Sequence, residues 1–148
     1  MKPNRETTSL VGVWRLEAIR DRLADGRIRP HPDFGRRVDG LLVYTRSGHV
    51  SVQFMRRGRP FWRNEEEPDE TERSRAGKGY GAYAGRFKVD RKRRVVLHHV
   101  ETALIPNRVG KTLRRSFSIA GDALTLFPPK FIRDGIPVER SLTWKRVG

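Results

Sequence analysis

The sequence predicts an all-β protein, a closed antiparallel up-and-down barrel of about eight strands with one short helical insertion near residues 66–78. Short segments in which apolar and polar residues alternate recur along the chain, as they do in half-buried strands. Tight-turn residues separate several of them, for example Arg46-Ser47-Gly48 and Gly121-Asp122. The length of 148 residues suits one domain. Closure into a barrel leaves no unpaired edge, although a two-sheet sandwich would accommodate the same strands.

We expect residues 1–9 to form a flexible lead and residues 10–148 to form the single domain. The predicted strands, in chain order, are residues 11–20, 40–45, 49–55, 80–89, 95–101, 111–119, 123–127 and 136–146. In the first strand, alternation places Trp14, Leu16 and Ala18 on one face and Ile19 on the other.

The insertion differs from the rest of the chain in composition. Pro68 and a run of acidic residues come before Arg73, Arg75 and Lys78, which is the order that the helix dipole favours. We expect a short helix that lies over one end of the barrel, attached through Phe61-Trp62. Whether residues 60–79 form a fixed plug or a moving lid is left open.

The richer apolar face of each strand is assigned to the barrel interior. This face contains Trp14, Leu16, Val52, Phe54, Tyr83, Phe87, Val96, His98, Val100, Arg115, Phe117, Leu124, Leu126, Leu142 and Trp144. Three of these residues, Tyr83, His98 and Arg115, bring polar groups into an apolar lining, where an unpaired neutral group costs about 1–3 kcal/mol. Gly81 and Gly85 share this face and mark a sharp bend, or leave space for a bulky neighbour or a ligand.

The interior polar residues have two readings. His98 is either a structural histidine with satisfied hydrogen bonds or a ligand contact. Arg115 pairs with a buried carboxylate, turns its head to the barrel mouth, or holds a carboxylate or enolate of a ligand. His99 is expected to face outward, because neighbouring strand residues point to opposite faces. The two histidines therefore cannot share a metal, and we predict neither a metal nor a cofactor.

The chain resembles the bacterial and fungal lipocalin-like domain family over residues 10–147. The resemblance rests on Leu10-Val11-Gly12-Val13-Trp14-Arg15-Leu16, Gly40-Leu41-Leu42-Val43-Tyr44-Thr45, Gly48-His49-Val50-Ser51-Val52, Tyr83-Ala84-Gly85, His98-His99-Val100-Glu101, Pro106-Asn107, Gly110, Arg115-Ser116-Phe117, Gly121-Asp122-Ala123-Leu124-Thr125-Leu126 and Leu142-Thr143-Trp144-Lys145-Arg146. It implies that Gly12 and Trp14 form the closed end of the barrel. Arg146 shares the Trp144 face, and we expect it to stack on the Trp14 indole.

The resemblance also implies an internal cavity for a small apolar molecule. The residues predicted to bind that ligand are Tyr44, Phe54, Tyr83, Phe87, His98, Arg115, Phe117 and Trp144. Some similar barrels are enzymes of natural-product assembly, so the alternative is a polyketide-type cyclase or isomerase of secondary metabolism. In that case the catalytic candidates are His98, Arg115 and Tyr83, for proton transfer and charge stabilisation. Whether the chain is an enzyme is left open.

The net charge of +15 raises a third possibility, a structural or nucleic-acid-adhering domain. The basic residues are spread along the chain and no known nucleic-acid-binding motif accompanies them, which argues against a specific nucleic-acid partner. The absence of cysteine suits a reducing cytoplasm. No apolar run reaches the roughly 20 residues of a membrane span, so no membrane partner is expected. A homodimer is left open.

Overall fold

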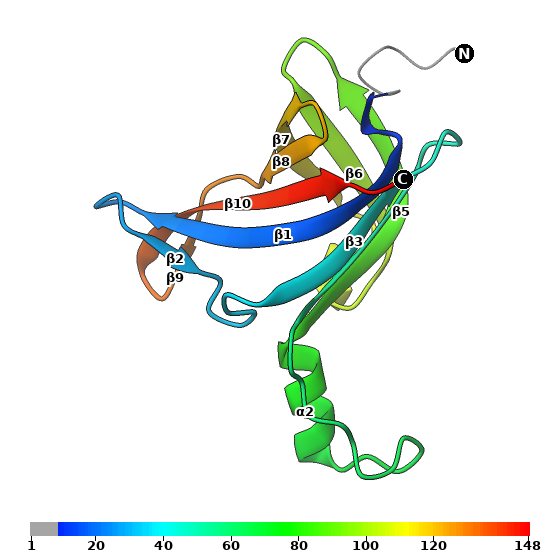
Figure 1. The fold of residues 1–148 in the computed structure, drawn as a ribbon, viewed down its shortest axis with the longest axis vertical. Helices are drawn as coiled ribbons and strands as arrows, with labels where there is room; N and C mark the ends of the chain where they lie inside the picture. Colours follow the sequence, from blue (N-terminus) through cyan, green and yellow to red (C-terminus); the bar gives the residue numbers. More distant parts are fainter. Residues whose placement is uncertain (1–8) are drawn as a thin grey trace.

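The protein forms a closed antiparallel β-barrel, which confirms the predicted fold class and excludes the sandwich (Figure 1). A computed structural model describes residues 9–148, so residues 1–8 of the lead predicted at residues 1–9 lie outside the described residues. The barrel strands are β1 (Gly12–Leu23), β3 (Val38–Tyr44), β4 (His49–Arg56), β5 (Tyr80–Asp90), β6 (Val95–Ala103), β7 (Thr112–Ala120), β8 (Ala123–Phe127) and β10 (Ile136–Arg146). They pair in the order β1-β3-β4-β5-β6-β7-β8-β10, and β10 returns to β1.

Two short strands that the sequence pattern did not predict extend the barrel wall at one end. β2 (Ile28–Pro30) pairs with the end of β1, and β9 (Phe131–Arg133) pairs with the start of β10. Each has three residues, which is too short for an alternating pattern to be recognised. Within residues 9–148, no helix is long and apolar enough to cross a membrane.

The predicted facing of the second half of β1 was wrong. The pairing of β1 with β10 shifts register between Leu16 and Ala18, as at a β-bulge. A bulge inserts one extra residue and reverses the inward and outward positions that follow it. Ile19 is therefore buried at 3% exposure, and Asp21 is buried at 1%, whereas Ala18 is only partly buried.

The insertion between β4 and β5 forms an arm that projects away from the barrel (Figure 1). Its helix α2 (Glu70–Lys78) has no buried residue, and Phe61 is 99% exposed. The prediction that this helix covers one end of the barrel, attached through Phe61 and Trp62, was therefore wrong, although Trp62 is partly buried. The helix itself was predicted correctly, but it begins later than residue 66.

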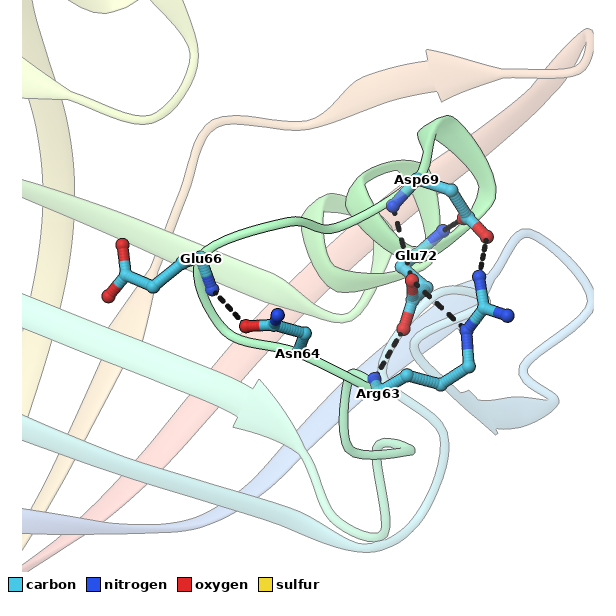
Figure 2. Close-up of polar contacts among 5 residues, drawn as sticks. All are labelled: Arg63, Asn64, Glu66, Asp69 and Glu72. Atoms are coloured by element: carbon cyan, nitrogen blue, oxygen red, sulfur yellow. Dashed lines mark hydrogen bonds and ion pairs between the residues drawn. The ribbon is translucent and has the colours of Figure 1, made fainter.

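Local hydrogen bonds hold the arm together. Asp69 caps α2 by accepting from the Glu72 amide at 2.8 Å, and the Asp69 amide donates to Glu72 Oε1 at 3.1 Å (Figure 2). This is a capping box. Glu72 Oε2 also accepts from the Arg63 amide at 2.8 Å, which ties the incoming loop to the helix. The arm is thus stabilised by its own polar contacts rather than by burial against the barrel.

The closed end of the barrel is built from the Gly-x-Trp segment and Arg146. The Trp14 indole is buried and donates to the Leu10 carbonyl at 2.9 Å. The Arg146 guanidinium lies 4.2 Å from the centroid of the Trp14 ring, so the predicted stacking is present. Arg146 also donates to the Val11 carbonyl at 2.8 Å. A Cβ at residue 12 would lie 2.6 Å from Arg146 Nη1, and φ there is 142°, so this position requires glycine.

The inward glycines of β5 serve packing and curvature. A Cβ on Gly81 would lie 2.6 Å from the ring of Phe54, so this glycine makes room for a bulky neighbour. Gly85 lies at a register shift between β5 and β6, where a Cβ would clash with the His99 carbonyl oxygen. The sequence allowed three explanations for these glycines: a sharp bend, space for a bulky side chain, or space for a ligand. The structure shows that Gly81 makes space for a side chain and that Gly85 lies at a bend in the strand.

The opposite end of the barrel is covered by the loop between β2 and β3. Phe34 from this loop is buried and packs edge-to-face on Phe54 and on His31, with ring centroids 5.0 and 4.6 Å apart. Phe34 thus belongs to the core although no strand carries it. The arm, the connection from β6 to β7 and the strand β9 leave the barrel at this same end, called here the mouth.

Candidate functional site

A cluster of three buried polar side chains lies inside the barrel. Tyr44 is on β3, Tyr83 on β5 and His98 on β6, and their exposures are 1%, 7% and 1%. β3 and β6 are separated in the sheet by β4 and β5, so Tyr44 reaches His98 across the interior rather than along the wall. Each of the three residues occupies an inward-facing position of its own strand, and closure of the barrel brings the three side chains together.

His98 is hydrogen-bonded on both ring nitrogens. Tyr44 Oη lies 2.7 Å from Nε2, and Tyr83 Oη lies 2.6 Å from Nδ1. His98 is therefore a structural histidine whose hydrogen bonds are satisfied within the protein, which is one of the two interpretations of the sequence. Neither ring nitrogen is free for a ligand. His99, which follows it, is exposed and contacts Thr112 Oγ1 at 3.2 Å, so the predicted outward orientation is confirmed.

Burial keeps the cluster uncharged. It lowers the pKa of His98 to about 3, with Arg115 as a second cause. It also raises the pKa of Tyr44 and of Tyr83, although the nearby arginines partly oppose this effect at Tyr83. At neutral pH the cluster is thus one imidazole and two phenols, all neutral.

The hydrogen count of the cluster leaves one donor uncommitted. A neutral imidazole has one N–H and one acceptor nitrogen. One tyrosine therefore donates its O–H to His98, and the other accepts the N–H of His98. The accepting tyrosine keeps its own O–H proton for another partner. Tyr83 lies nearer the mouth and carries the greater exposure of the two phenols.

Arg115 stands beside this cluster on the inner face of β7. Val96 pairs with Arg115 and His98 pairs with Leu113, so Arg115 and His98 are diagonal neighbours across two strands. The side chain is partly buried, and Nη1 donates to the Arg114 carbonyl at 3.0 Å. Among residues 9–148 no carboxylate forms an ion pair with Arg115. The possibility that Arg115 pairs with a buried carboxylate of these residues is therefore excluded.

Arg108 is a member of the site that the sequence analysis missed. It closes a short 3-10 helix, η1 (Pro106–Arg108), in the connection from β6 to β7. Its guanidinium carbon lies 5.9 Å from the centroid of the Tyr83 ring, and its side chain is partly buried. Burial and the charge of Arg115 lower the pKa of Arg108. The alternation of apolar and polar residues assigns inward and outward positions only within strands. It therefore could not place Arg108, which lies in a loop.

Apolar side chains surround the polar cluster. The Phe87 ring packs edge-to-face on Tyr44 with centroids 4.7 Å apart, Phe117 is buried, and Phe54 is partly buried nearer the mouth. Trp144 is 1% exposed, and its Nε1 has no hydrogen-bond partner within the described part of the chain. A buried donor without a partner is costly, so this indole N–H is a second open donor in the interior.

Most of the residues predicted for the site therefore face one interior. Tyr44, Tyr83 and His98 touch one another, and Arg115 lies next to them. Gly12, Trp14 and Arg146 form the closed end, separate from the polar cluster. The arrangement offers hydrogen-bond donors and positive charge to a small molecule with an oxygen at one end.

Comparison with known proteins agrees with this architecture. A family model described as a lipocalin-like domain matches residues 11–147. A protein of Aspergillus oryzae named 4'-hydroxy-3'-methoxypropiophenone carrier protein ppsC is 34% identical over 109 residues, which cover 66% of this chain and 96% of that protein. No solved structure matches the chain significantly. The chain belongs to the lipocalin-like domain family, as the sequence motifs indicated.

Proposed function

We propose that this protein is a carrier that binds a small, mainly apolar aromatic molecule inside the barrel, with an oxygen of the ligand at the Tyr44–His98–Tyr83 cluster. The observation that carries the proposal is the hydrogen-bonded cluster of two phenols and one imidazole, which is buried among aromatic side chains. The hydrogen count of a neutral imidazole leaves one of the two phenol O–H groups available to a ligand. Ligand sites of this kind are apolar pockets with a few placed polar groups. An eight-stranded barrel has room for interior side chains or one small ligand.

The relative's name supports the ligand class. The ligand named for that relative, 4'-hydroxy-3'-methoxypropiophenone, is an aromatic ring that carries phenol, methoxy and ketone oxygens. Such a molecule would accept the O–H of Tyr83 at one oxygen, and its ring would pack against Phe87, Phe117 and Phe54. The open N–H of Trp144 would serve a second oxygen. We therefore propose a class of ligand for this chain, small oxygen-bearing aromatic ketones, and not one particular compound.

Carriage is favoured over catalysis because His98 is a poor base. Burial lowers its pKa to about 3, and both nitrogens are already hydrogen-bonded. Efficient general bases have a pKa near the working pH. His98 is therefore better suited to orienting the two tyrosines than to taking a proton from a ligand. The proposed location of the carrier is the cytoplasm, which the absence of cysteine favours.

Fluorescence titration tests the proposal directly. Trp14 and Trp144 are buried in the barrel, so a bound aromatic ketone should quench their emission. We expect saturable quenching by 4'-hydroxy-3'-methoxypropiophenone. Tyr83→Phe removes the proposed hydrogen bond to the ligand together with the contact to His98, and it keeps the ring. The dissociation constant should rise about 5- to 10-fold, corresponding to roughly 1 to 1.4 kcal/mol.

Tyr80→Phe is the matched control, because Tyr80 lies on the same strand but on the outer face, where it stacks with Arg59. Its affinity should equal that of the wild type. Mass spectrometry after prolonged incubation should recover the ketone unchanged. Absence of quenching, or equal affinities of wild type and Tyr83→Phe, would refute binding at this cluster, and conversion of the ketone would refute a pure carrier.

A further inference from the structure

Two arginines face the tyrosine–histidine cluster without a counter-charge. The Arg108 guanidinium lies 5.9 Å from the Tyr83 ring centroid, and Arg115 is the diagonal neighbour of His98 on the inner face. Across the described residues, no aspartate or glutamate forms an ion pair with either of them. Both are partly buried. A guanidinium stays protonated in proteins, so two positive charges remain on this side of the cluster.

The third arginine at this end is neutralised. Arg140, on β10, donates from Nε and Nη2 to the two carboxylate oxygens of Asp21 at 2.7 and 2.9 Å. Asp21 is buried at 1% exposure, which makes this a paired and largely desolvated bridge. The chain thus supplies a carboxylate where a buried arginine needs one. Arg108 and Arg115 differ from Arg140, because within residues 9–148 no such carboxylate pairs with either of them.

The polar side chains of the cluster and the two arginines beside it are all neutral or cationic. Tyr44 on β3, Tyr83 on β5 and His98 on β6 are neutral, and Arg108 and Arg115 are cationic. Among the described residues at this end, the carboxylate of Asp21 on β1 is engaged with Arg140, and that of Asp33 with Arg133. An oxygen that enters here meets a phenol O–H and two guanidinium groups. Such surroundings stabilise an oxyanion more than a neutral oxygen.

We propose that the barrel binds its ligand as an oxyanion, specifically as the phenolate of an acidic aromatic ketone, held by Tyr83, Arg108 and Arg115. A phenol conjugated with a para ketone loses its proton readily, because the negative charge spreads onto the ketone oxygen. On binding, the O–H bond of the ligand breaks, its proton passes to the buffer, and its electron pair stays on the phenolate oxygen. This inference rests on the proposed carrier function and adds the ionisation state of the ligand.

Absorption spectroscopy distinguishes the two ionisation states, because the phenolate of such a ketone absorbs at longer wavelength than the phenol. The probe is 4'-hydroxy-3'-methoxypropiophenone at a pH where the free compound is mostly protonated. Bound to the wild type, it should show the phenolate band, and its protonation midpoint should fall by at least about one pH unit. That shift corresponds to roughly tenfold preference for the anion. At a pH where the free probe is fully ionised, the compound 3',4'-dimethoxypropiophenone, which cannot ionise, should bind about tenfold more weakly than the probe.

Variants assign the effect to the two arginines. Arg108→Met and Arg115→Met should each reduce the phenolate band and return the midpoint toward that of the free ligand. Arg114→Met is the matched control on the same strand, because Arg114 faces outward and is exposed, and it should leave the band unchanged. Removal of either inward arginine should also raise the melting temperature of the ligand-free protein, because it relieves a repulsion between like charges.

The outcomes separate the two proposals. Tight binding with the spectrum of the neutral phenol, or equal affinity for the dimethoxy compound, would overturn the oxyanion inference and leave the carrier function standing. Failure of both compounds to bind would overturn the carrier function, and the inference with it. A phenolate band that persists in both arginine variants would show that Arg108 and Arg115 do not hold the anion.

Discussion

His98 and its two tyrosines define the chemistry of the interior at the scale of single residues. The imidazole links phenols from β3 and β5, and each of its nitrogens makes one short hydrogen bond. Burial keeps the His98 imidazole neutral in the folded protein. The same imidazole takes up a proton more readily in the unfolded chain, so the free energy of unfolding falls in acid. His31, at the mouth, shows the same effect, because burial lowers its pKa to about 4.

Acid should therefore destabilise the protein through these histidines. The folded pKa of His98 is about 3, below the ordinary value of 6.5. Its stabilising contribution is complete above pH 6.5 and is lost as the pH falls from 6.5 toward 3. Between pH 7.5 and 5.0, His98→Gln should lose about 2 kcal/mol less stability than the wild type, measured by urea unfolding at both pH values.

The adjacent His99 provides the control for this measurement. It is exposed on the outer face, so His99→Gln should follow the wild-type pH dependence. Equal losses of stability in His98→Gln and the wild type would contradict the idea that His98 is held neutral by burial.

The sequence predicted the identity of these polar residues better than their partners. Strand alternation placed Tyr83, His98 and Arg115 in the interior, because each belongs to a regular strand. It could not show that Tyr44 meets His98, since that contact crosses the barrel between strands that are not neighbours. It also could not find Arg108, whose position depends on a loop conformation.

The arm between β4 and β5 is the element that departs most from expectation. Its charge order correctly predicted a helix, because capping and the helix dipole act locally. Its placement depends on tertiary packing, and the helix buries nothing. The β1 bulge is a similar case, because one extra residue in a strand leaves no mark in an alternating sequence that continues on both sides.

Replacement of residues 60–78 by a short Gly-Ser linker should leave the barrel intact. The ends of the arm already meet, since the Arg56 amide donates to the Gly79 carbonyl at 2.8 Å. No apolar core is lost, so the free energy of unfolding should change by less than about 1 kcal/mol. Affinity for 4'-hydroxy-3'-methoxypropiophenone should also be unchanged. Loss of cooperative unfolding, or a weaker complex, would show that the arm supports the barrel or closes over its ligand.

The whole molecule combines a structural end and a polar interior in one barrel. Gly12, Trp14 and Arg146 close one end, and Phe34 covers the mouth. Between them lies a neutral hydrogen-bonded cluster, and beside it are two arginines that form no ion pair within the described part of the chain. The overall fold was predictable because turn residues and alternation repeat along the chain. For the site, the sequence could predict the inward-facing residues of regular strands. It could not predict contacts across the barrel or the position of a loop residue.

A crystal structure of the protein with 4'-hydroxy-3'-methoxypropiophenone tests the central claim most directly. The ligand should lie inside the barrel, with its ring against Phe87 and Phe117 and one oxygen within hydrogen-bonding distance of Tyr83 Oη, about 2.5–3.0 Å. The guanidinium groups of Arg108 and Arg115 should face that same oxygen. A ligand bound only to the outer wall or to the arm, with the Tyr44–His98–Tyr83 cluster unoccupied, would contradict the claim that this cluster is the binding site.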